Sequence, residues 1–256
     1  MDFKTYLSLD RLSNSSLQNL AKSPLHYKHA KENPAEETEA MTIGRAVHSA
    51  ILTPDLFDKE YVAAPACDRR TKLGKEMWDA FCLANEGKEV LKSSQYDECK
   101  KISASVLSSP KIKNMLEKGL SEQTYLYEIE GVEMKSRLDL DADEFIVDVK
   151  TTKDASLSQF SKDFVNFGYD VQFGLYQHAK FLKTGKKVPV IILAVEKEAP
   201  YDYSVFRVPE IYLENGLKKA EKLISLYKKC KDTDTWPGLS KDITDLEVLP
   251  WYKIEE

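Results

Sequence analysis

The spacing of the hydrophobic positions changes near the middle of the chain. Up to residue 118, apolar residues recur every three to four positions, which is the period of an amphipathic helix. Polar caps and prolines limit these helices, and Pro24 interrupts or restarts the first of them. We therefore expect helices over residues 13–23, 42–54, 71–86, 93–108 and 110–118, with a polar loop at 31–40.

Beyond residue 118, strand and helix patterns alternate. Residues 124–131 and 132–143 read as two strands that meet at Gly131, which predicts an antiparallel hairpin. The order of elements predicts an α/β fold, with a mixed central sheet flanked by helices behind a mainly helical N-terminal half. The remaining elements are a strand at 145–150, helices at 156–167 and 170–184, strands at 188–197 and 203–208, and a long helix from 209 to about 230.

The length of 256 residues fits one large domain, which we expect to comprise a helical part (1–118), an α/β core (119–230) and a tail (231–256). Hydrophobic residues make up 42% and charged residues 31%, as in ordinary soluble proteins. No apolar run approaches the roughly 18 residues that span a membrane, and the N-terminus lacks a signal-peptide layout. We therefore expect a cytoplasmic protein without membrane association.

Charge and cysteine content further narrow the classes of protein to which the chain could belong. The net charge of −5 does not by itself indicate a nucleic-acid binder, although a local basic lining can still hold phosphates. The cysteines at 67, 82, 99 and 230 contain no CxxC pair, so we expect reduced thiols and no zinc or iron–sulfur site.

Two charged residues interrupt the apolar strand in the sequence EFIVDVKTTKD. Asp148 and Lys150 lie two positions apart, and strand side chains at that spacing point to the same side. Burying such charges costs several kcal/mol (about 3–5) unless they are paired or bind metal. The alternative interpretation is a pair of solvent charges at the end of the strand.

A second aspartate, Asp139, lies in the preceding hairpin strand within SRLDLD. Adjacent strands would bring Asp139 close to Asp148, and two neighbouring carboxylates repel unless a divalent cation lies between them. Carboxylate ligands favour Mg²⁺ or Mn²⁺, which typically serve phosphoryl chemistry. Lys150 would then orient an attacking water or stabilise charge on a phosphate.

Two helical motifs offer further polar groups. In GRAVH, Gly44 and His48 share a helix face at i and i+4, and a helical glycine costs about 1 kcal/mol relative to alanine, so we expect it to clear space. His48 is either a metal ligand or a packed core histidine. In QFGLY, Gln172 and Tyr176 share a face; together they could hydrogen-bond a phosphate, a water or a carboxylate, or they are a surface amide beside an interfacial phenol.

The ordered set GRAVH, RLDLD, VDVKTT and QFGLY resembles the PD-(D/E)xK nuclease superfamily, in the branch with GxxxH and QxxxY motifs that includes RecB-type and Cas4-type nucleases. The likeness is closest to the RecE type, the nuclease domain of phage and prophage exonuclease VIII, over about residues 10–230. One departure is that the second acidic position is Asp148, giving DxK in place of the commoner ExK. The late cysteine triad of the Cas4 type is missing, which disfavours an iron–sulfur cluster.

This resemblance implies a restriction-endonuclease-like core that degrades linear duplex DNA from its ends, 5′ to 3′, with Mg²⁺ or its substitute Mn²⁺. It also implies a ring-like homo-oligomer and a single-strand annealing partner of the RecT type. Among the residues, it makes Asp139, Asp148 and the Val149 carbonyl metal ligands, with His48 as a further ligand. Lys150 would act on the attacking water, and Gln172 and Tyr176 would hold the site or the DNA strand.

Two other places have open interpretations. Arg69, Arg70 and Lys72 precede a helix with Trp78 and Phe81, and they either grip DNA phosphates beside an aromatic wedge or form a solvated helix start. Glu122 either adds an acidic contact to the site or is a surface residue.

Three functions remain in competition on the sequence alone. The leading hypothesis is a Mg²⁺-dependent exodeoxyribonuclease that exposes single strands for recombination by annealing. The alternatives are an endonuclease of restriction or repair type and a non-catalytic subunit that binds DNA ends.

Overall fold

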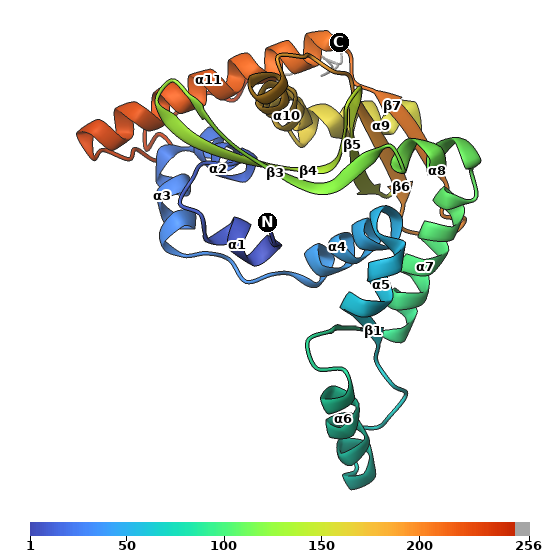
Figure 1. Ribbon diagram of the computed structural model, residues 1–256. Coiled ribbons are helices and arrows are strands. Elements are labelled where there is room, and N and C mark those ends of the chain that lie inside the picture. The colour runs from blue at the N-terminus through green and yellow to red at the C-terminus, as the bar shows by residue number, and fades with distance from the viewer. Residues whose placement is uncertain (249–256) are drawn as a thin grey trace, which may run out of the picture.

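The computed structural model describes residues 1–248 and has a five-stranded mixed sheet at its centre (Figure 1). The strand order is β3-β4-β5-β6-β7; β5 and β6 are parallel and the other neighbours are antiparallel. Helices cover both faces, which confirms the predicted α/β fold class. The strands are β3 (Gly119–Ile129), β4 (Val132–Ala142), β5 (Phe145–Thr152), β6 (Val190–Glu196) and β7 (Tyr203–Arg207).

The hairpin of β3 and β4 forms as its sequence predicts. Glu130 and Gly131 connect the strands with φ angles of 52° and 80°, the left-handed pair that a tight two-residue hairpin turn requires. β3 begins five residues earlier than the alternating pattern indicated. The segment before Thr124 is polar, and it becomes a strand because it pairs with the end of β4.

Two hydrophobic cores lie on opposite faces of the sheet. β5 separates them, because Ile146 packs into one and Val147 and Val149 pack into the other. The first core involves α2 (Asn14–Lys22), α3 (Pro24–Glu32), α9 (Leu157–Asn166), α10 (Tyr169–Thr184) and α11 (Glu210–Thr233); the second involves α4 (Glu39–Leu52), α5 (Pro54–Glu60), α7 (Ser93–Leu107) and α8 (Pro110–Leu116).

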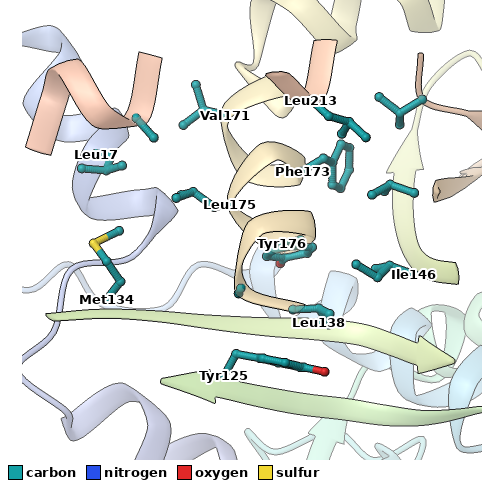
Figure 2. Packing of buried hydrophobic residues seen from close by; sticks show 14 of the residues in the cluster. Leu17, Tyr125, Met134, Leu138, Ile146, Val171, Phe173, Leu175, Tyr176 and Leu213 are labelled. Atoms are coloured by element: carbon teal, nitrogen blue, oxygen red, sulfur yellow. The ribbon is translucent and has the colours of Figure 1, made fainter. Parts of the chain in front are cut away.

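Helix α10 is the central element of the first core. Figure 2 shows its Phe173, Leu175 and Tyr176 above the sheet, near Leu138 of β4 and Ile146 of β5. Its other side packs closely on α11, where the backbone of the two helices meets at Gly174 and Gly216. This packing positions one end of α10 directly over the charged end of β5.

Three features were not expected from the pattern. A short helix α1 (Phe3–Ser8) precedes α2, and Pro54 begins α5 instead of only closing α4, since proline suits the first turn of a helix. Short parallel strands β1 (Tyr61–Ala63) and β2 (Glu89–Leu91) support α6 (Lys72–Ala84), which stands away from the sheet as an arm (Figure 1). Within residues 1–248, no helix combines the length and apolar character needed to cross a membrane.

Candidate metal and phosphodiester site

Asp139 and Asp148 come together where the β4–β5 ladder stops. The ladder pairs Leu140 with Val147 but extends no further toward Asp139. Instead, the Val149 backbone N–H donates to Oδ2 of Asp139 at 2.8 Å. The carboxylate thus takes the place of a main-chain acceptor, and the two strands diverge beyond it.

The neighbouring strand is irregular at the same level. The β3–β4 ladder skips the pair formed by Glu122 and Asp139, and Glu122 has a left-handed φ of 57°. Leu138 and Leu140 consequently pack into cores on opposite faces, although they are only two residues apart. This distortion turns Glu122 toward Asp139.

Burial changes the protonation of both aspartates. Asp148 is completely buried and Asp139 nearly so. Desolvation raises the pKa of each to about 7, and the charge of Asp139 further raises the pKa of Asp148. The site therefore holds negative charge poorly without a cation, and it resists full ionisation at neutral pH.

Lys150 provides one positive charge. Its Nζ lies 2.6 Å from Oδ2 of Asp148 and over the rings of Tyr169 and Phe173, at 4.9 and 5.3 Å from their centroids. Burial opposes the charged form, but the fields of Asp148 and Asp139 outweigh it and raise the pKa of Lys150. Lys150 is thus an ammonium ion that can donate hydrogen bonds but cannot accept a proton.

His48 completes a group of potential metal ligands. Its Nδ1 lies 3.3 Å from Oδ2 of Asp139, and burial lowers its pKa, which favours the neutral imidazole that binds metals. Ligand atoms of His48, Glu122 and Asp139 all lie within 4.8 Å of one another. One nitrogen and several carboxylate oxygens suit Mg²⁺ or Mn²⁺, so the residues present fit a divalent cation.

Gln172 and Tyr176 face this group from α10. Nε2 of Gln172 donates to the Tyr176 hydroxyl at 2.8 Å and lies 3.4 Å from Oδ1 of Asp148. Burial raises the pKa of Tyr176 well above its ordinary value, so its phenol stays neutral. Gln172 therefore orients the carboxylate of Asp148, and the phenol of Tyr176 faces the open side of the site.

The cluster opens into a cleft of about 750 Å³ whose wall includes His48, Glu122, Asp139 and Tyr176. Arg137 also lines it; its Nε donates to Oε2 of Glu122 at 2.6 Å. Arg137 was not expected at the site from the sequence, although it precedes Asp139 by only two positions on the same strand.

The space near Gly44 is open. A Cβ atom added there would meet nothing within 4 Å, so no protein group fills the room that the glycine leaves. The side chain of Val149 packs into the core on the face of β5 opposite to Asp148, while its backbone N–H donates to Asp139.

The basic residues near α6 lie elsewhere. Arg69 stacks on the Trp78 ring at 4.4 Å, Arg70 pairs with Asp68 at 2.9 Å, and Lys72 is exposed at the start of the arm. None of them is among the residues that line the cleft of the cluster. Their proposed contact with DNA phosphates therefore remains a prediction about the arm.

Comparison with known proteins agrees with this geometry. Residues 13–246 match the family model described as a PDDEXK-like domain of unknown function (DUF3799). The crystal structure of a "Putative exonuclease" from Eubacterium rectale superposes with a TM-score of 0.67 at 18% identity, covering 97% of this chain and 96% of its own. A structure of SSO0001 reaches a TM-score of only 0.35 at 14% identity, covering 87% of this chain and 81% of its own. No curated protein sequence matches the chain.

The matched segment includes every residue of the charged cluster, and the solved neighbour shares the fold over almost its whole length. The chain belongs to the PDDEXK-like domain family and has the fold of the PD-(D/E)xK superfamily.

Proposed function

We propose that the protein is a divalent-metal-dependent nuclease that degrades linear duplex DNA from its ends. The observation that best supports this function is the buried pair of Asp139 and Asp148 with Lys150 beside it, where Asp139 lines an open cleft. Neighbouring carboxylates with pKa values near 7 form a site for a cation. The solved neighbour named as an exonuclease supports the same reaction class.

The residues of the chain have distinct roles in this mechanism. Asp139, Asp148, His48 and Glu122 would hold Mg²⁺ or Mn²⁺, with the Val149 carbonyl as a further ligand. When bound, the cation supplies Lewis-acid stabilisation of the phosphate and lowers the pKa of water. Lys150 donates to the phosphate oxygens or to the attacking water, a role that suits the ammonium form favoured by its raised pKa.

Gln172 and Tyr176 act on the arrangement of the site. The hydrogen bond between them places the Gln172 amide at Asp148, and the neutral phenol can donate to a phosphate oxygen of the strand in the cleft. Their loss would therefore affect positioning more than the charge of the centre.

The finer features of the proposal rest on the resemblance to RecE-type exonucleases. They are cleavage from 5′ to 3′, a ring-like homo-oligomer, and delivery of the exposed strand to an annealing protein of the RecT type during recombination. A host cytoplasm is the location that fits such a phage or prophage enzyme.

The decisive experiment is digestion of 5′- and 3′-labelled linear duplexes with Mg²⁺, beside a covalently closed plasmid. We expect loss of the linear DNA from its 5′ ends and an intact circle. Cleavage of the circle would indicate an endonuclease instead.

Substitutions test the residue roles in the same assay. Asp148→Ala and Lys150→Ala should each lower the rate by about 100-fold or more, the range seen when one electrostatic contact to a transition state is removed. Lys153→Ala is the matched control, because Lys153 is exposed just beyond β5. Full activity in either of the first two variants, with the fold retained, would refute this site, and DNA binding without any metal-dependent cleavage would favour an end-binding subunit.

A further inference from the structure

Helix α1 lines the cleft of the cluster with Phe3 and Tyr6 and does not join either core. None of its residues, Phe3 to Ser8, is buried. The chain after it is anchored, because Leu12 exchanges backbone hydrogen bonds with Glu133 and Lys135 at the free edge of β4. The helix is therefore attached at its C-terminal end and packed only at the surface.

Two cations of β4 hold α1 in place. Nζ of Lys135 donates to the carbonyl oxygens of Tyr6, Leu7 and Leu9 at 2.9, 3.2 and 2.8 Å. Nη1 of Arg137 donates to the Met1 carbonyl at 2.9 Å. Backbone carbonyls of the first nine residues thus accept hydrogen bonds from both cations, and Arg137 also donates to Glu122 and Thr124.

Aromatic rings of α1 cover the same cations. The Tyr6 ring lies 4.8 Å from Nζ of Lys135, and the Phe3 and Tyr6 rings lie 5.7 and 5.9 Å from the guanidinium carbon of Arg137. Phe3 also covers Arg45 at 5.7 Å. Each of these contacts is a cation–π interaction, so the two rings shield the cations from water.

Lys135 has no counter-charge in contact with it. Lys135 is only 7% exposed, yet no carboxylate within residues 1–248 lies within 4.0 Å of its Nζ. The other two cations differ, since Arg137 pairs with Glu122 and Arg45 pairs with Glu37 and Glu89. The buried ammonium of Lys135 is hydrogen-bonded only to backbone carbonyls. It can therefore bind an anion once those carbonyls move away.

The position of these cations fits a DNA strand. Lys135 and Arg137 are two positions apart in β4 and point to one side of the strand, and Arg137 lines the cleft together with the metal ligands Asp139 and Glu122. Tyr6, Arg137 and Tyr176 line both the cleft of the cluster and a second cleft of about 620 Å³ on the α2 side. Helix α1 thus lies at the boundary between two clefts that meet at the reactive centre.

We propose that Lys135 and Arg137 bind consecutive phosphates of the DNA strand that enters the site, and that α1 covers them until the strand displaces it. The inference rests on the proposed nuclease function and adds a phosphate-binding site and its cover. Phosphate oxygens replace the carbonyl oxygens of residues 1–9 at the same cations, and α1 swings out about its anchor at Leu12.

Hydrogen exchange tests the movement directly. The Lys150→Ala variant of the full chain is used, so that a blunt linear duplex stays intact during the measurement. We expect the amides of residues 3–9 to exchange faster when the duplex is bound, while those of α11 do not change. Slower or unchanged exchange at α1 would overturn the proposal, because the helix would then remain in place or belong to the DNA interface.

Salt dependence tests the phosphate contact. In Lys135→Gln, the slope of log K against log salt concentration for duplex binding should become shallower by about 0.9, the value for one lost phosphate contact. Lys228→Gln is the matched control, since Nζ of Lys228 also donates to a backbone carbonyl, that of Glu130, at 2.7 Å. Equal slopes in Lys135→Gln and the unmodified protein would refute the role of Lys135.

Loosening the cover should have the opposite effect. The double change Phe3→Ala and Tyr6→Ala removes the aromatic contacts, and we expect duplex affinity to rise about two- to fivefold, with no rise in a Lys135→Gln background. Weaker binding would show that the rings contact DNA and would overturn the proposal that α1 covers the cations.

Cleavage by the unmodified protein is measured in parallel. If the protein neither binds nor cleaves the duplex, the proposed function fails. If it cleaves the duplex but α1 and Lys135 show none of the expected responses, only the present inference is rejected.

Discussion

Asp139 is held beside Asp148 and the backbone N–H of Val149, in a place where its carboxyl group ionises only near neutral pH. An unfolded aspartate has a pKa near 3.8, whereas burial raises that of Asp139 to about 7. Between these values the folded state binds more protons than the unfolded state, so the free energy of unfolding falls as pH rises through this window. A metal ion would offset that loss.

Asp139→Asn should therefore stabilise the metal-free protein at pH 8, by about 1–3 kcal/mol, with little difference near pH 4. The amide oxygen can still accept from Val149 while the buried charge is removed. Urea unfolding in chelator at both pH values measures the effect. Asp141→Asn is the matched control and should destabilise, because it leaves the buried Lys180 without its carboxylate. A loss of stability in Asp139→Asn at pH 8 would contradict the assignment.

Metal affinity should depend on pH for the same reason. Protons compete with the cation at Asp139 and Asp148, so Mn²⁺ should bind more tightly at pH 8 than at pH 6, with release of protons. Calorimetric titration in buffers of different ionisation enthalpy measures both. Affinity that does not change with pH would show that these carboxyl groups are not ligands.

At the scale of single residues, part of the candidate site could be predicted from the sequence. The closeness of Asp139 and Asp148 follows from two neighbouring strands and the period of two, and the structure brings these side chains together. The place of Glu122 could not be derived, because it depends on a left-handed backbone at a non-glycine residue. Arg137 and Lys135 look like ordinary strand charges until α1 is seen to lie against them.

Among the elements, α10 positions Gln172 and Tyr176 because α11 presses it onto the sheet. The two helices meet at glycines, and a Cβ atom at Gly216 would lie 1.9 Å from the Asp170 carbonyl oxygen. Such close approach of helix backbones leaves no space for a methyl group. The amphipathic patterns predicted both helices, but they did not indicate this crossing.

Gly216→Ala should accordingly destabilise the protein by about 1–3 kcal/mol or more through overpacking. The matched control is Gly44→Ala, also inside a helix, where the open space allows a gain of up to about 1 kcal/mol from better helix propensity. Thermal unfolding of both variants measures the pair of effects. If Gly216→Ala were as stable as the unmodified protein, the close approach of the α10 and α11 backbones at Gly216 would be contradicted.

Over the whole molecule, the arm and the cleft are separate basic regions of a protein with a net charge of −5. The arm places Arg69, Arg70 and Lys72 away from the sheet, whereas Arg137 lines the cleft of the cluster, Lys135 lines the second cleft and Lys150 pairs with Asp148. An overall negative charge therefore does not exclude DNA binding, because the positive charges are local.

The arm should contribute to affinity and not to chemistry. Replacing Arg69, Arg70 and Lys72 together by glutamine should weaken duplex binding and make its salt dependence shallower by up to about three phosphate contacts. The cleavage rate at saturating DNA should remain the same. Filter binding over a salt series and single-turnover cleavage separate the two, and an unchanged salt slope would leave the arm without a role in DNA binding.

The sequence by itself determined the order of the main helices and strands and the hairpin at Gly131, because local periodicity and turn preferences encode them. It also indicated Asp139, Asp148 and Lys150 as candidate site residues. Only the tertiary structure decided that Glu122 joins His48 and Asp139, that α6 stands apart, and that α1 lies on Lys135 and Arg137. These features depend on contacts between distant segments and on burial, which raises the pKa of Asp148 to about 7. No local pattern contains that information.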